Sequence, residues 1–229
     1  MIGVPPFDLD VVDRLLTTTK AVRRRLDLDR PVPRDVILEC LRVASYAPNA
    51  SNAQDWRWIV VDDPDQRRRV GEQYRKEVEW RCTKMLASKE SAGDEAGARI
   101  TRSVLYLAQR MADVPVLVVP CYDIDAAAAR YDRLLGAEGA PAEMTPAMFA
   151  SILPAVWSFQ LALRSRGLGS TLTTAHQEDQ PAMARILGIP DGWYQVALIP
   201  CAYTTGGDFR PSRRDPVADT VIWNRFGVP

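Results

Sequence analysis

The stretch APNASNAQDW, residues 47–56, decides the fold because it joins a helical pattern to a strand. Pro48 ends the helix, since the residue before a proline is pushed out of helical geometry. The turn that follows is rich in polar side chains, namely Asn49, Ser51, Asn52 and Gln54, which bond readily to nearby backbone. The strand WRWIVV begins at Trp56. A polar loop between two rigid elements is typical of binding sites, and an ordinary connector has the same composition.

A basic cluster precedes this stretch, at Lys20, Arg23, Arg24 and Arg25. The guanidinium group offers a planar fork of donors that suits phosphate, so the cluster is a candidate anion site. A solvated basic surface is the alternative interpretation of such a charge run.

A third candidate stretch is RGLGSTLTTAH, residues 166–176, whose glycines and threonines predict extended backbone with accessible N–H groups. It ends at His176, the only histidine of the chain. Acid catalysis, a structural role and a surface position all remain open for His176, because general acid catalysis depends on a geometry that sequence does not provide.

Four stretches, in this order, resemble the FMN-dependent nitroreductase family. TTTKAVRRRLDLDRPVP resembles its R-R-S-x-R opening followed by P-V-P, and APNASNAQDW resembles A-P-S-x-x-N-x-Q-P-W. RGLGSTLTTAH resembles its G-L-G-S segment, and LGIPDGWYQVALIPCAY followed by RRDPVADTV resembles its closing pattern. Thr19, Ala21 and Asp55 depart from the family residues Arg, Ser and Pro. The region from Arg75 to Gln109 matches no segment of the family.

The resemblance implies an FMN site and assigns its residues by position. It places Lys20 at the phosphate and Arg23 at the N1–C2=O edge of the flavin, with Arg213 and Arg214 closing on the phosphate. The Thr174 amide would face N5, with Leu172 and Thr173 beside it. The family is a homodimer, and the second subunit would contribute Pro48, Asn49 and Asn52 to the same flavin. A cation at the N1–C2=O edge favours the reduced, anionic flavin. No catalytic side chain and no metal ligand is assigned, because the family's hydride chemistry takes place on flavin N5.

The expected fold class is α+β. The pattern alone predicts three core strands, at 57–61, 114–123 and 194–203, and about seven helices, in an α/β or α+β layered domain. Asp8 is a candidate cap of the first helix, and the polar helix from Asp65 to about Ser88 is expected to be mostly solvated. After a flexible connection at 136–144, Thr145-Pro146 begins the most apolar helix, which is expected to be central, and a short helix runs from Gln180 to Leu187. The resemblance adds a central mixed or antiparallel sheet flanked by helices. We expect a single domain over 1–229, with a helical insertion at about 75–110 and a C-terminal dimerisation tail at about 215–229 that wraps a partner subunit.

Composition excludes several functional classes. The 29 acidic residues balance 29 Lys plus Arg, which argues against binding to nucleic acid or to an anionic membrane. The four cysteines form no CxxC pair, so buried thiols in a reducing compartment are favoured over zinc or disulfides. No apolar run approaches about 18 residues, and the N-terminus MIGVPPFDLD does not resemble a signal peptide. A soluble cytoplasmic protein is the expectation.

The leading hypothesis is an oxidoreductase that takes hydride from NADH or NADPH onto FMN and reduces nitroaromatic, quinone or related acceptors in a ping-pong scheme. No GxGxxG or GxxxxGK[ST] motif indicates a resident dinucleotide or P-loop site, and no GxSxG or SxxK motif indicates a hydrolase. Two alternatives remain. One is a same-fold enzyme of flavin fragmentation or reductive dehalogenation, and the other is a flavin-binding or regulatory protein without turnover. A deazaflavin donor also stays open.

Overall fold

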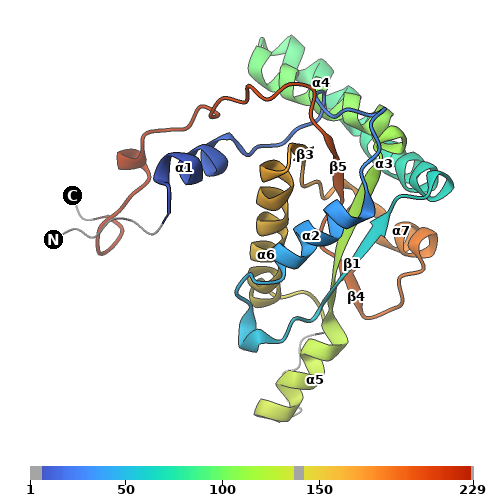
Figure 1. The fold of residues 1–229 in the computed structure, drawn as a ribbon, viewed down its shortest axis with the longest axis vertical. Helices are drawn as coiled ribbons and strands as arrows, with labels where there is room; N and C mark the ends of the chain where they lie inside the picture. Colours follow the sequence, from blue (N-terminus) through green and yellow to red (C-terminus); the bar gives the residue numbers. More distant parts are fainter. Residues whose placement is uncertain (1–6, 137–141, 228–229) are drawn as a thin grey trace.

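An antiparallel sheet forms the centre of the molecule in the computed structural model, which describes residues 7–136 and 142–227 (Figure 1). Its strands are β1 (Trp56–Val61), β2 (Val116–Asp123), β3 (Leu168–Ser170), β4 (Trp193–Gln195) and β5 (Ile199–Tyr203). They lie in the order β1-β2-β5-β3, and β4 pairs with β2. All recorded strand pairs are antiparallel, which confirms the expected α+β class with a central sheet.

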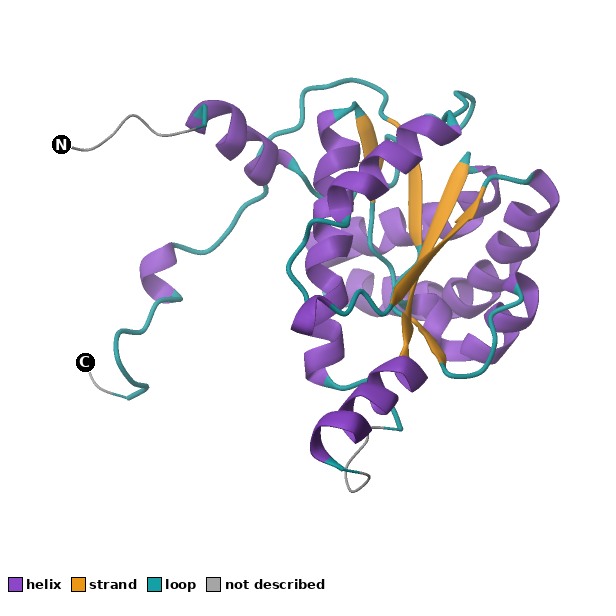
Figure 2. Cartoon of the chain, turned by 60° about the horizontal axis from the view of Figure 1, so that its bottom comes forward, coloured by secondary structure: helices purple, strands orange, loops and turns teal. Residues whose placement is uncertain are grey.

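Helices cover both faces of this sheet (Figure 2). The helices in the described residues are α1 (Leu9–Thr18), α2 (Arg34–Ala44), α3 (Pro64–Ser91), α4 (Glu95–Arg110), α5 (Ile124–Leu135), α6 (Pro146–Ser165) and α7 (Gln180–Leu187). Strand β2 explains the layering, because its side chains alternate between faces. Val116 and Val118 pack in the core with α2 and α6, whereas Leu117 and Val119 pack in the core with α3, α4 and α7.

The C-terminal core strand differs from the prediction. A single strand was expected over 194–203, but it divides into β4 and β5 with residues 196–198 between them. Val196 donates to Pro120 O, and Leu198 exchanges backbone hydrogen bonds with Thr173 instead. Strand β3 was predicted only as part of an extended stretch, because three residues are too short to show a period-two pattern.

Helix α3 begins before the expected insertion at about 75–110, which spans its C-terminal part and α4, and it is less solvated than expected. A narrow stripe of its side chains is buried, namely Val70, Tyr74, Val78 and Cys82. These residues recur every four positions and therefore lie on one face. They pack against α4 and the sheet, so the prediction of a mostly solvated helix is wrong for that face.

Helix α6 is the central apolar helix, as predicted, and Thr145 caps it by accepting a hydrogen bond from Met148 N. Its length and composition would suffice to cross a membrane, so the expectation that no apolar run approaches that length is wrong for this helix. Ile152, Phe159 and Leu163 are nonetheless fully buried in the core with α2 and the sheet. A core helix of this kind passes the same test of length and composition.

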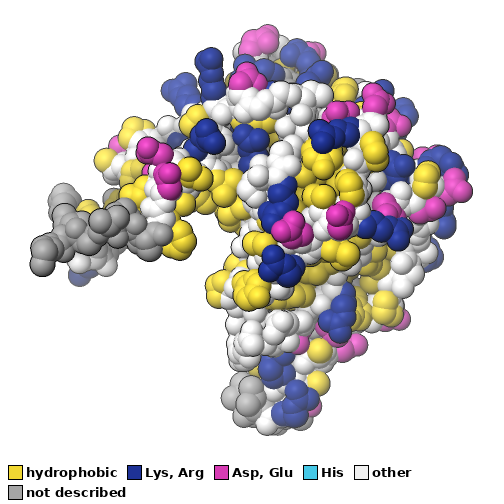
Figure 3. All heavy atoms as spheres, viewed as in Figure 1, with side chains coloured by type: hydrophobic (Ala, Val, Ile, Leu, Met, Phe, Trp, Pro, Cys, Tyr) yellow, Lys and Arg dark blue, Asp and Glu magenta, His cyan; other side chains and the backbone are white. Residues whose placement is uncertain are grey.

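Helix α1 and the C-terminal segment extend together from one side of the body (Figures 1 and 2). Asp8 caps α1, and η4 (Val217–Asp219) is a short 3-10 turn within the C-terminal segment. Both segments are rich in exposed apolar side chains, namely Leu9, Val11, Leu16, Val217, Val221, Ile222, Trp223 and Phe226. Hydrophobic side chains also gather where α1 and the C-terminal segment meet the body of the molecule (Figure 3). The flexible connection expected at 136–144 falls largely on residues 137–141, outside the described residues.

Candidate functional site

The basic cluster lines a hollow of about 420 Å³ on one side of the sheet. Its walls are Lys20, Ala21, Val22, Arg23, Arg24, Arg25, Ser103, Asp208, Phe209 and Arg210. A hydrogen bond from Val22 N to Ser170 O holds this segment beside β3. Lys20 Nζ donates to Arg210 O at 3.0 Å, and Arg25 pairs with Asp208 at 2.7 Å. Since Asp208 is the one carboxylate in the wall, the hollow carries a net positive charge.

Arg23 is the most desolvated cation of this hollow. Burial lowers the pKa of its guanidinium, and the nearby Tyr74 phenol is the one group that favours the charged form. A half-buried guanidinium still stays charged at neutral pH, and an unpaired buried charge is costly. An incoming anion would relieve that cost, so the donor set fits a phosphate or an anionic ring edge.

Tyr74 connects the hollow to the 166–176 stretch. Its ring is buried on α3, and its hydroxyl shares a 2.9 Å hydrogen bond with Thr173 Oγ1. Burial raises the pKa of the Tyr74 phenol, so it remains protonated at neutral pH. The Tyr74 hydroxyl therefore lies near Arg23 and is hydrogen-bonded to Thr173, although the sequence did not single this tyrosine out. A tyrosine at the helical spacing of Val70 and Val78 was its only signal.

The 166–176 stretch is extended only in part. After β3, Thr173 forms an isolated bridge with Leu198, and the 3-10 helix η3 (Ala175–Asp179) follows. Leu172 and Thr174 are exposed, whereas Thr173 is half-buried. This leaves the two flanking residues accessible to a ligand beside an anchored Thr173.

His176 is buried, and both of its ring nitrogens lack a hydrogen-bond partner among the described residues. Burial lowers its pKa to about 4. The imidazole is therefore neutral at pH 7 and enclosed in protein, which disfavours the acid-catalysis hypothesis. The alternative of a structural residue fits this position.

The 47–56 loop lies away from the cationic hollow, next to α6 and the end of β2. Pro48 and Asn52 are exposed, while the Asn49 carboxamide accepts from Gln54 N at 3.0 Å. The structure thus separates these three residues from Lys20 and Arg23 within one protomer, since none of them lines the hollow. Ser51, with φ of 55°, and Gln54, with φ of 54°, adopt left-handed backbone, which is uncommon for residues other than glycine and clusters at functional sites.

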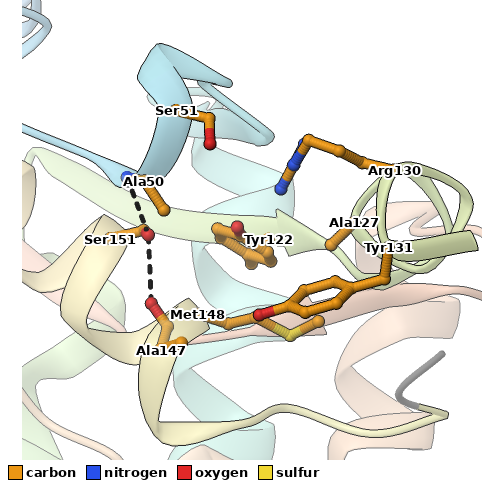
Figure 4. Close-up of a pocket in the computed structure, with 9 residues that line it drawn as sticks. All are labelled: Ala50, Ser51, Tyr122, Ala127, Arg130, Tyr131, Ala147, Met148 and Ser151. Carbon is orange, nitrogen blue, oxygen red and sulfur yellow. Dashed lines mark hydrogen bonds between the residues drawn. The ribbon is translucent and has the colours of Figure 1, made fainter. Parts of the chain in front are cut away.

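A cavity of about 210 Å³ opens beside this loop. Figure 4 shows Arg130 and Ser51 on one side of it, Tyr131 and Met148 on the opposite side, and Tyr122 between them. Ala50 N donates to Ser151 Oγ at 3.2 Å, which fixes the loop to α6.

Arg130 is held over this cavity by Asp55, whose Oδ2 lies 2.5 Å from Nη1 of Arg130. Asp55 Oδ2 also lies 3.5 Å from the hydroxyl of Tyr122, which donates to it. Burial, together with the nearby Asp55, raises the pKa of the Tyr122 phenol, so it stays protonated at neutral pH. In the sequence, Asp55 stands out only as a departure from the family's proline, and Arg130 belongs to no motif.

Arg213 and Arg214 are exposed on the C-terminal segment, and neither lines the hollow. Arg214 donates to the carbonyl of Arg213 at 2.9 Å. Arg210 of the same segment lines the hollow within the protomer, and the position assigned to Arg213 and Arg214 at the phosphate stays a prediction.

The model of the nitroreductase family matches residues 17–203, most of the chain. This chain belongs to the nitroreductase family. The match covers the 20–25 segment and Ser103 of the cationic hollow and the whole 47–56 loop, and it confirms the resemblance seen in the sequence.

Individual relatives are distant. Rat iodotyrosine deiodinase 1 is 24% identical over 84% of this chain, and the aligned region spans only 62% of the deiodinase. An NADH dehydrogenase of Thermus thermophilus is 25% identical over 94% of this chain and 98% of its own length. Together with the family match, these relatives indicate an oxidoreductase.

Solved structures share the fold. An oxidised iodotyrosine deiodinase bound to FMN and 3-iodo-L-tyrosine superposes with a TM-score of 0.68 at 21% identity, covering 94% of this chain and 100% of that chain. The FMN- and NADPH-dependent nitroreductase NfnB of sphigopyxis sp. strain HMH gives a TM-score of 0.65 at 18% identity, covering 93% and 99%. The nitroreductase-like fold is therefore confirmed.

Proposed function

We propose that this protein is an FMN-dependent oxidoreductase that takes hydride from NADH or NADPH and reduces nitroaromatic, quinone or related electron-poor acceptors. The observation that carries the proposal is the desolvated Arg23, which has no ion-pair partner among the described residues, in a cationic hollow beside the hydrogen-bonded pair Tyr74 and Thr173. The FMN named in the related deiodinase structure and the FMN and NADPH named for NfnB support it.

Lys20, with Arg24 and Arg210 nearby, would hold the FMN phosphate, and Arg23 would face the N1–C2=O edge. A threonine at 19 and an alanine at 21 offer fewer side-chain donors than the family's Arg and Ser, and Arg24 and Arg25 lie in the same wall. Leu172, Thr173 and Thr174 would lie along the flavin, with the Thr174 amide directed at N5.

Bound FMN supplies two-electron transfer between donor and acceptor. For a quinone, NAD(P)H and one proton yield NAD(P)⁺ and hydroquinone.

The proposal includes a homodimer. Trp223 and Phe226 are 82% and 86% exposed in the protomer, and an apolar patch of this kind marks an association surface. Pro48, Asn49 and Asn52, remote from the hollow of their own protomer, would then reach the flavin of the partner, and Arg213 and Arg214 would close on a phosphate. Light scattering of the full chain and of a chain ending at Asp215 tests this, since the shorter chain should be monomeric.

The location proposed is cytoplasmic. All four cysteines are free and buried, at Cys40, Cys82, Cys121 and Cys201. Burial raises the pKa of Cys121 to about 12, so that thiol is inert at neutral pH. Buried free thiols are typical of a reducing compartment.

The decisive experiment is the visible absorption spectrum of the purified protein and of the supernatant after heat release. FMN in the supernatant, followed by NADH or NADPH oxidation with a quinone, supports the proposal. Bound FMN without turnover would favour a flavin-binding protein. Absence of FMN, with no binding on addition, would contradict the proposal.

Reductive dehalogenation is the second candidate, favoured by the similarity to rat iodotyrosine deiodinase 1. Assaying the reduced protein with 3-iodo-L-tyrosine alongside nitrobenzene and a quinone separates the two. Release of iodide faster than reduction of the other acceptors would favour dehalogenation.

A further inference from the structure

We propose that the cavity beside the 47–56 loop binds a single-ring aromatic compound whose oxygen substituent accepts a hydrogen bond from Arg130. In the proposed function, on which this role rests, that compound is the electron acceptor. The lining comes from three separate elements: the loop (Ala50, Ser51), the β2–α5 region (Tyr122, Ala127, Arg130, Tyr131) and the first turns of α6 (Ala147, Met148, Ser151).

The size of the cavity selects a small ring. An apolar cavity of about 150 Å³ is large enough to bind benzene, and this cavity measures about 210 Å³. It therefore accommodates one substituted ring and is too small for the three fused rings of a flavin. The cavity is thus distinct from the FMN site proposed at the cationic hollow.

The walls suit an aromatic face. Tyr131 and Met148 lie on the side opposite Arg130 (Figure 4). Ala127 and Ala147 also line the cavity, and their small side chains leave room for a ring. Aromatic rings and the methionine thioether make favourable contacts with an inserted ring.

The polar end of the cavity selects the substituent. Arg130 uses Nη1 for Asp55, and a guanidinium has five N–H donors, so donors remain for a ligand. The side chains of Arg130 and Asp55 are 19% and 10% exposed, and the pair is neutral overall. Asp55 opposes a fully charged carboxylate at this position, so a nitro group or a quinone carbonyl is the better match.

The position of the cavity agrees with an acceptor site. Ala50 and Ser51 directly follow Asn49, which the proposed function assigns to the flavin of the partner. The left-handed Ser51 turns its side chain toward the cavity (Figure 4). A ligand here would touch the same loop as the flavin.

Nitrobenzene is the probe, and its dissociation constant is measured by equilibrium dialysis against the oxidised full-length protein without an electron donor. We expect saturable binding that weakens at least tenfold in Ala147→Trp. Ala147 is exposed on the first turn of α6, so the indole fills the cavity from its rim and leaves the core intact. Saturable binding of equal strength in this variant would overturn the proposal, as would absence of binding to the wild type.

A second variant tests the same site independently, in case Ala147→Trp does not fold. Asp55→Asn combined with Arg130→Met removes the guanidinium without leaving a buried carboxylate unpaired, and binding should weaken about tenfold. Arg133→Met, an exposed position on the same helix, is the matched control and should bind as the wild type does. Unchanged binding in the double variant would overturn the assignment of Arg130.

The same preparations distinguish this inference from the proposed function. In turnover with NADH or NADPH, Ala147→Trp should raise KM for nitrobenzene. Bound FMN without nitrobenzene binding would overturn the cavity site and leave the flavin proposal intact. Nitrobenzene binding without FMN would contradict the acceptor role together with the proposed function.

Discussion

The hydroxyl of Tyr74 lies 2.9 Å from Oγ1 of Thr173, although 99 residues separate the two in the chain. This hydrogen bond ties α3 to the loop after β3, and Arg23 lies near enough to the same phenol to influence its pKa. Helix α3, whose C-terminal part falls in the expected insertion, is therefore hydrogen-bonded to one segment proposed to contact the flavin and lies near the other.

Tyr74→Phe tests this connection. The variant keeps the buried ring and removes one hydrogen bond, so the free energy of unfolding should fall by about 1 kcal/mol. Reduction of bound FMN by NADH or NADPH should slow as well, because Thr173 and Thr174 lose an anchor. Urea unfolding and stopped-flow absorbance measure the two effects. Tyr106→Phe, which keeps a ring for Arg24 to stack on, should match the wild type in both. A flavin reduction rate that is unchanged in Tyr74→Phe would show that the bond is only structural.

Arg23→Ala should weaken FMN binding and slow flavin reduction. A hydrogen bond to a charged group is worth about 1.5–3 kcal/mol, which corresponds to roughly a 10- to 100-fold increase in the dissociation constant of FMN. Arg23→Lys keeps the charge but not the planar fork, and we expect an intermediate loss. Fluorescence titration with FMN provides the constants. Arg68→Ala removes an exposed guanidinium paired with Asp65 and is the control. Equal FMN affinity and equal spectra in Arg23→Ala and the wild type would contradict the assigned role.

His176 should make stability depend on pH. Its pKa is lowered to about 4 by burial, against about 6.5 in the unfolded chain. Between these values the unfolded state binds the extra proton. The contribution is therefore fully present above pH 6.5 and is lost as the pH falls toward 4, by up to about 1.4 kcal/mol per pH unit.

His176→Gln removes this titration, and urea unfolding at intervals from pH 7.5 to 4.5 measures it. The wild type should lose stability more steeply than the variant below pH 6.5. Carboxylates titrate alike in both proteins, so the difference between the two curves isolates the imidazole. Parallel curves would mean that His176 is not buried in the neutral form.

Gly71→Ala should destabilise the protein although alanine favours helices. A Cβ at this position on α3 would lie 2.5 Å from the backbone nitrogen of Ala112 and 2.7 Å from its Cα, so the α3–η2 contact, where η2 spans Met111–Asp113, would have to open. Overpacking costs about 1–3 kcal/mol, which exceeds the roughly 1 kcal/mol gained in helix propensity. Thermal unfolding should show a lower midpoint. Gly207→Ala, where the added Cβ meets no atom within 4 Å, should leave the midpoint nearly unchanged, and equal midpoints for both variants would contradict the packing argument.

The sequence alone determined the elements whose signals are local. Helix α7 has the predicted bounds, from Gln180 to Leu187, and α6 begins at Pro146, where Thr145-Pro146 indicated a helix start. Asp8 likewise caps α1. Caps, prolines and short apolar runs act through neighbours within about four residues. The local sequence therefore predicts where such elements begin and end. The basic cluster and the polar 47–56 loop were equally visible, since they are contiguous.

Tertiary structure decided which of these elements meet. A period of about 3.6 residues shows that one face of α3 is apolar but does not name the face it packs against, and many arginines obscured even that stripe. Tyr74 with Thr173, and Arg130 with Asp55, are pairs whose members lie on different elements. Such contacts form only when the sheet order β1-β2-β5-β3 brings distant segments together. The sequence therefore named the cationic and loop residues, whereas packing alone created the buried tyrosine link and the ring-sized cavity.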